Sequence, residues 1–152
     1  MSQTTTAFTE TQERTELRKA VAALGAKYGR DYFEKAAADG RKTTELWAEA
    51  GKLGYLGVAV PEEFGGGGGD IGDLAAVCEE LAAAGSPLLL MVVSPAIVGT
   101  IIAQYGTQEQ KQTWLPGLAD GTSTFAFSIT EPDAGSNSHN ITTTAARDGG
   151  EA

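Results

Sequence analysis

The stretch Phe127-Ser128-Ile129-Thr130-Glu131-Pro132-Asp133-Ala134-Gly135-Ser136 decides the fold class, because helical patterning gives way there to a strand pattern. In residues 123–130 apolar side chains alternate with small or polar ones, which predicts a half-buried strand. The apolar face of this strand carries Phe125, Phe127 and Ile129. Pairing should stop just after Thr130, since Pro132 cannot donate a ladder hydrogen bond.

The turn that follows the strand has the composition of a polar binding edge. Asp133 and Gly135 favour a tight turn, and the strand end presents the hydroxyls of Thr130 and Ser136 beside free backbone amides. Such an edge suits a polar, anionic cofactor. From the residues alone, a plain strand threonine and a plain turn serine remain the simpler interpretation.

The chain before this stretch is patterned for helices. Apolar residues at spacings of three and four predict an amphipathic helix from Thr15 to Ala38, which Gly25 and Gly29 should weaken without ending. A second helix should start at Thr43 or Thr44 and stop at Gly54. A third should run to Gly85 from a cap at Asp70 or Asp73, with its apolar stripe on Leu74, Val77, Cys78 and Leu81.

A fourth helix is predicted in the uncharged run 88–103. Ser86-Pro87 is a strong helix start signal, and a kink or restart is expected at Ser94-Pro95. The run is short for a membrane span, so a helix buried on all sides is the better interpretation. Thr107 and Gln110 have the spacing of a capping box and predict a fifth helix toward Pro116.

Five consecutive glycines, Gly65 to Gly69, invite comparison with phosphate-binding loops. No Lys-Ser or Lys-Thr follows them, and no strand feeds a helix in a βαβ unit, so that motif fails on its context. The run is therefore expected to be a flexible loop between helices.

Composition excludes several functions. The net charge of −9 argues against nucleic acid as a partner, because phosphate binding needs a basic face. Cys78 is the single cysteine and is expected to be a buried structural thiol. His139, the single histidine, has no neighbours with metal-ligand spacing. With no secretory signal visible, a cytoplasmic location is expected.

Three segments follow from these patterns: a frayed or disordered N-terminus (1–14), a helical domain (15–121) and the start of a β-domain (122–152). A second strand is expected at Ile141–Arg147, with a hairpin turn at Asp148-Gly149-Gly150. A two-stranded piece is marginal alone, so the chain is expected to be the N-terminal part of a longer protein.

The run Ser-Ile-Thr-Glu-Pro-Asp-Ala-Gly-Ser-Asn (128–137) resembles the signature of the acyl-CoA dehydrogenase family of flavoproteins. Two further landmarks precede it in the right order, Val60-Pro61-Glu62-Glu63-Phe64-Gly65-Gly66 and Tyr105-Gly106-Thr107-Gln108-Glu109-Gln110-Lys111. The resemblance covers residue 17 to the end. It implies a mostly α fold, in which an N-terminal helical domain is followed by the first strands of a β-barrel-like middle domain.

The resemblance also implies a cofactor, FAD, and a reaction, the dehydrogenation of an acyl-CoA thioester to the trans-2-enoyl-CoA. Thr130 would hydrogen-bond the flavin near N5 and O4, and Gly135 would allow close approach. Ser136 would reach the flavin pyrophosphate or the bound acyl-CoA. Backbone and packing around the flavin ring would come from Phe127, Ser128 and Ile129.

The family's acyl tunnel would lie along the buried fourth helix, with Leu88, Leu89, Val92 and Ala96 on one wall, although core packing explains these residues equally well. The family's catalytic glutamate would lie beyond Ala152. Glu131 is expected to hold the turn and not to act as the base. The expected partners are an electron-transfer flavoprotein and further subunits of a homo- or heterotetramer.

Two other functions stay open. One is an oxygen-using relative, such as an acyl-CoA oxidase or a flavin-dependent hydroxylase. The other is non-catalytic: a helical interaction module, or an inactive partner subunit of the same fold.

Overall fold

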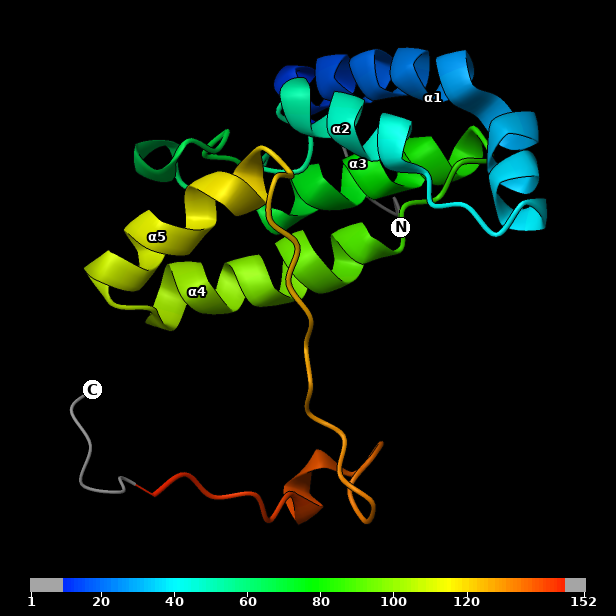
Figure 1. The fold of residues 1–152 in the computed structure, drawn as a ribbon. Helices are drawn as coiled ribbons and strands as arrows, with labels where there is room; N and C mark the ends of the chain where they lie inside the picture. The colour runs from blue at the N-terminus through cyan, green and yellow to red at the C-terminus, as the bar shows by residue number, and fades with distance from the viewer. Residues whose placement is uncertain (1–9, 147–152) are drawn as a thin grey trace, which may run out of the picture.

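The computed structural model describes residues 10–146, and helices are the regular elements of that part of the chain (Figure 1). The only β-pairing within it is an isolated bridge between Glu131 and Ala134. In chain order the helices are α1 (Gln12–Ala38), α2 (Thr44–Lys52), η1 (Glu62–Phe64), α3 (Ile71–Ala83), η2 (Val92–Gly99), α4 (Thr100–Tyr105), α5 (Gln108–Ala119) and η3 (Ser138–Asn140).

Helix α1 begins earlier than the sequence predicts and is broken near its end. Thr11 caps it by accepting a hydrogen bond from the Arg14 backbone amide at 3.1 Å. Gly29 has φ 68° and ψ −179°, a conformation open almost only to glycine, and the helix kinks there (Figure 1). The prediction that Gly29 would not interrupt the helix is wrong. The disorder expected of the N-terminus falls mostly on residues outside those described.

The side chain of Ser86 supports the break in α1. Its hydroxyl donates a 2.6 Å hydrogen bond to the carbonyl of Gly29, and the residue is completely buried. Ser86 was expected to cap the fourth helix, with Pro87 at its first position. Instead residues 86–88 are not helical, because the Ser86 hydroxyl is engaged by α1.

Replacing Ser86 with alanine should lower the free energy of unfolding by about 1–3 kcal/mol, because the part-buried Gly29 carbonyl would lose its donor. Urea titration followed by circular dichroism checks this. Ser136→Ala is the control, since that side chain is exposed. Equal midpoints for the two variants would contradict the role assigned to Ser86.

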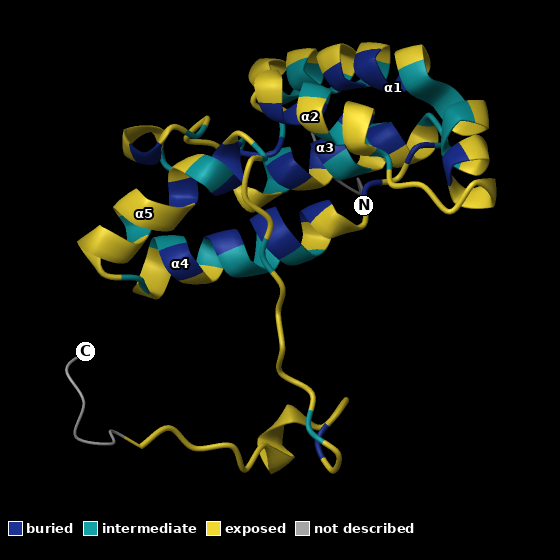
Figure 2. Cartoon of the chain, viewed as in Figure 1, coloured by how far each residue is buried: buried dark blue, intermediate teal, exposed yellow. Residues whose placement is uncertain are grey.

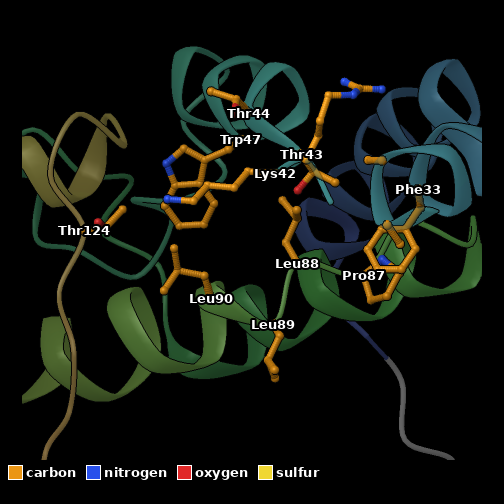
Figure 3. Close-up of a pocket in the computed structure, with 13 residues that line it drawn as sticks. Phe33, Lys42, Thr43, Thr44, Trp47, Pro87, Leu88, Leu89, Leu90 and Thr124 are labelled. Carbon is orange, nitrogen blue, oxygen red and sulfur yellow. The ribbon is translucent and has the colours of Figure 1, made fainter. Parts of the chain in front are cut away.

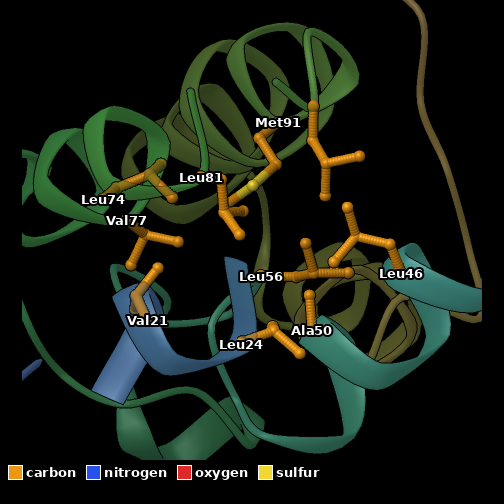
Figure 4. Close-up of a cluster of buried hydrophobic side chains, with 10 residues drawn as sticks. Val21, Leu24, Leu46, Ala50, Leu56, Leu74, Val77, Leu81 and Met91 are labelled. Atoms are coloured by element: carbon orange, nitrogen blue, oxygen red, sulfur yellow. The ribbon is translucent and has the colours of Figure 1, made fainter. Parts of the chain in front are cut away.

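Helices α1 and α3 pack together around the first core cluster (Figure 4). Charged pairs line one edge of this contact: Arg14 meets Asp73 at 2.8 Å, and Arg18 meets Glu80 at 2.9 Å. The buried members of the cluster are Val21, Leu24, Leu46, Ala50, Leu56, Leu74, Val77, Leu81, Leu88 and Met91.

The capping of α3 is confirmed, since Asp70 and Asp73 form a reciprocal capping box.

The glycine run forms a loop between η1 and α3, as expected, but it is held in place. The amides of Gly67, Gly68 and Gly69 each donate a 2.9 Å hydrogen bond to a carbonyl within residues 57–60. Three successive bonds hold the loop against residues 57–60. Glycines suit this loop because its backbone lies close to the backbone of that segment.

The fourth helix runs through Pro95 without restarting. Its central part, η2, is a π-helix and continues directly into α4. Because Pro95 has no amide hydrogen, it cannot donate the ordinary α-helical bond, and wider π-turns are a known local adjustment. None of the helices in residues 10–146 is long and apolar enough to cross a membrane.

Helix α5 closes the body over a second core cluster. Its capping box is confirmed, with Thr107 accepting from the Gln110 amide and Gln110 accepting from the Thr107 amide. The buried members of the cluster are Val60, Phe64, Ile102, Leu115, Leu118 and Ala119. Beyond α5, the Trp47 indole donates to the Gly121 carbonyl at 2.9 Å and ties α2 to the end of the body.

The chain then leaves the helical body as an extended segment that reaches η3 (Figures 1 and 2). The strands expected at 123–130 and 141–147 do not form within the described residues, because no other segment there supplies a ladder of backbone hydrogen bonds. The hairpin expected at 148–150 lies outside the described residues.

Candidate functional site

The extended segment is anchored to the helical body at its beginning. Ser94, completely buried in η2, accepts a hydrogen bond from the Phe125 amide at 3.1 Å. The Phe125 side chain packs against the second core cluster. The uncharged helix and residue 125 are therefore joined by one part-buried hydrogen bond, and the packing of Phe125 adds to this anchor.

Beyond Phe125 the segment is an open edge. Phe127 and Ile129 are 42% and 45% exposed, so the apolar face predicted for this strand is covered only at Phe125. The hydroxyls of Ser128 and Thr130 lie on exposed residues. The amides of residues 126–130 find no acceptor within residues 10–146. This edge therefore offers unpaired donors beside apolar side chains.

A tight turn follows, as the sequence predicts. The amide of Glu131 donates to the Ala134 carbonyl at 3.0 Å, and the Ala134 amide donates back at 3.2 Å. Ala134 is buried by the turn. Gly135 is open, since a Cβ built there would meet no atom within 4 Å, and Ser136 is exposed.

The Glu131 carboxylate closes a larger loop. It accepts hydrogen bonds from the Thr142 amide at 2.9 Å, the Thr142 hydroxyl at 3.0 Å and the Thr143 amide at 2.8 Å. These bonds favour the charged form and lower the pKa of Glu131 to about 2. This geometry agrees with the expectation that Glu131 holds the turn, since a carboxylate bound in this way is a poor proton acceptor.

The Glu131 carboxylate should therefore remain ionised from pH 8 down to pH 4. Its pKa is depressed in the folded chain, so the loop bonds are fully present above the ordinary glutamate pKa and are lost as pH falls towards about 2. Carbon-detected NMR titration of the side chain measures this. A Glu131 midpoint at the ordinary glutamate pKa would show that the loop bonds are absent in solution.

A pocket of about 460 Å³ lies between the end of α1, the start of α2 and the segment that precedes η2 (Figure 3). Its wall is mainly apolar, and Arg41 and Lys42 contribute two cations. The lining residues are Phe33, Ala36, Ala37, Arg41, Lys42, Thr43, Thr44, Trp47, Pro87, Leu88, Leu89, Leu90 and Thr124.

Of the four residues predicted to share one apolar wall, the pocket brings together only Leu88 and Leu89. Val92 is 45% exposed outside the pocket, and Ala96 packs against the first core cluster. The prediction assumed α-helical spacing from residue 88 onward. Residue 88 instead precedes the helix, and the π-turns of η2 change which residues align.

The opposite wall of this pocket, which includes Phe33 and Trp47, was not predicted from the sequence. Trp47 packs against the first core cluster, so no local signal separated it from residues that only build the core. Trp47 was detectable only through its contact with Gly121, which lies far along the chain.

The remaining reactive side chains form no second site. Cys78 is half-buried against the first core cluster, and burial raises the pKa of its thiol. His139 lies on η3, and the described residues contain no group of three or more potential metal ligands.

The described chain is thus a helical body that leads into a donor-rich extended edge. The comparisons give the family. Residues 11–122 match the Acyl-CoA dehydrogenase, N-terminal domain family. The chain therefore belongs to the acyl-CoA dehydrogenase family.

Among curated relatives, acyl-CoA dehydrogenase FadE12 of Mycobacterium tuberculosis is 64% identical over 97% of this chain. The chain spans 38% of that relative's length. Acyl-CoA dehydrogenase from Geobacillus kaustophilus superposes with a TM-score of 0.82 at 36% identity, covering 95% of this chain and 38% of that structure.

A Bacillus anthracis acyl-CoA dehydrogenase, solved as a complex with FAD, superposes with a TM-score of 0.74 at 31% identity. That match covers 87% of this chain and 23% of the solved chain.

Proposed function

We propose that this chain is the N-terminal part of an FAD-dependent acyl-CoA dehydrogenase that converts an acyl-CoA thioester to the trans-2-enoyl-CoA. The observation that carries the proposal is the open donor edge at residues 126–130 with the turn that follows it to Ser136, placed directly after a helical domain of this family. We further propose that residues 15–121 form the helical domain and that 122–152 begin the β-domain.

The residues of the edge fit a flavin nucleotide in their chemistry. Unpaired amides and exposed hydroxyls match the acceptor-rich rim of the flavin ring and its anionic pyrophosphate. Phe127 and Ile129 offer apolar surface for the ring, and the space around Gly135 is open. When bound, FAD would supply the hydride acceptor. Thr130 would bond the ring near N5 and O4, and Ser136 the pyrophosphate or the acyl-CoA.

For the substrate, Leu88 and Leu89 would contact the acyl chain from the pocket wall. Val92, which is exposed, would extend that apolar surface. Ala96 we assign to core packing. The chain's part in the reaction is to bind, to orient and to exclude water. The catalytic base is proposed to lie in the rest of the polypeptide, because Glu131 is already bonded three times.

We also propose an electron-transfer flavoprotein as electron acceptor, a homo- or heterotetrameric assembly and a cytoplasmic location. These follow from family membership and from the resemblance of the signature run.

Native mass spectrometry of the complete polypeptide tests the proposal, because one spectrum reports subunit number and bound cofactor. FAD in a tetramer, followed by acyl-CoA-dependent bleaching of the flavin, is the expected result. Rapid reoxidation by oxygen would favour an oxidase or hydroxylase instead. A complete polypeptide without flavin would leave the role of a partner subunit.

A further inference from the structure

The Glu131 carboxylate holds together the two ends of the loop formed by residues 132–141. Its bonds to Thr142 and Thr143 join the two ends of the segment 132–141 through one side chain. The other hydrogen bonds within that segment are local turns, such as the Asn140 amide to the Asn137 carbonyl at 3.2 Å. Without the carboxylate, no bond among the described residues would span the loop.

The position of this closure matters because Glu131 directly follows Thr130, and Ser136 lies inside the loop. We propose that Glu131 is a positioning residue for the flavin, holding the loop so that the hydroxyls of Thr130 and Ser136 act on one ligand. The inference rests on the proposed function.

A carboxylate is required for this role, and glutamine cannot replace it. One oxygen accepts both Thr142 donors, while the other accepts the Thr143 amide. In Glu131→Gln one oxygen becomes an NH₂ group, which would face a donor amide. At least one charge-assisted bond is lost, and the neutral side chain weakens the rest.

The partners of Glu131 all lie within residues 131–143, and none belongs to the helical body. Its loss should therefore leave the stability of the helices unchanged. This separates a positioning role from a general structural one.

The experiment uses the complete polypeptide, as wild type and as E131Q, with FAD as the probe. E131Q should raise the Kd for FAD about tenfold, the typical net effect of losing one hydrogen bond to a charged group. At saturating FAD the visible circular dichroism of the flavin should also change. The melting temperature of the flavin-free protein should not.

Two further variants sharpen the test. Asp133→Asn removes a charge from the same turn but none of the loop-closing bonds, which all go to Glu131, so its Kd should not rise above that of wild type. Thr142→Val removes only the hydroxyl donor and keeps both backbone donors, so its Kd should lie between wild type and E131Q.

Three results would overturn the inference. If E131Q and wild type bind FAD with the same Kd and spectrum, Glu131 positions nothing and the proposed function stands. If E131Q lowers the melting temperature of the flavin-free protein, Glu131 is a general structural residue. If wild type itself binds no FAD, the proposed function fails and the inference fails with it.

Discussion

Replacing Gly66 with alanine should lower the free energy of unfolding by about 3 kcal/mol or more, because the new methyl group has no space. A Cβ at this position would overlap the carbonyl oxygen of Val60 and lie 2.5 Å from its carbonyl carbon. These are backbone atoms, so no side-chain rotation relieves the overlap. The neighbouring bond from the Gly68 amide to the Val60 carbonyl would be disturbed as well.

Gly67→Ala is the matched control for this variant. A Cβ at Gly67 would lie 3.1 Å from the Val58 carbonyl oxygen, a tight contact that a small shift relieves. We expect the free energy of unfolding to fall by less than about 1 kcal/mol, in the range of an ordinary substitution. Urea titration of Gly66→Ala and Gly67→Ala measures the two losses. Equal losses would mean that the glycines contribute through backbone flexibility and not through close approach.

The helices were predictable from the sequence because their signals are local. The apolar spacing of α3 and the Asp70–Asp73 box lie within one or two turns of chain. The same holds for the capping box of α5. Periodicity and caps are short-range features, so the order and type of these helices could be read without knowledge of the tertiary fold.

The predictions failed where a residue with a local helix signal instead contacts a residue far away in the sequence. Ser86-Pro87 is a sound helix start in isolation, but the Ser86 hydroxyl is taken by the Gly29 carbonyl, far away in the sequence. One hydrogen bond thus links the break at Gly29 to the delayed start of the fourth helix. Local sequence patterns could not reveal this link.

The candidate site was predictable in part, because some of its signals are local as well. The turn after Thr130 and the structural use of Glu131 follow from local residue types. The single apolar wall failed because a π-helix changes the alignment of Leu88, Val92 and Ala96. The strand pattern at 123–130 describes what the side chains favour, whereas a strand also needs a partner, and none lies within the described residues.

Truncating Leu81 to alanine should lower the free energy of unfolding by about 2–5 kcal/mol. Leu81 is completely buried in the first core cluster, where α3 faces α1 and Met91 (Figure 4). The cost combines lost burial with a cavity, and the close approach of Gly25 on α1 to Ala84, the C-cap residue of α3, limits how far the two helices can move together to fill it.

Leu53→Ala, the same truncation at a residue that is 51% exposed, is the matched control. It should cost less than about 1 kcal/mol, because little apolar area is lost and no enclosed cavity forms. Urea unfolding of both variants at equal protein concentration gives the comparison. If Leu81→Ala unfolded at the same urea concentration as Leu53→Ala, the contact between α1 and α3 would not be the main core of the domain.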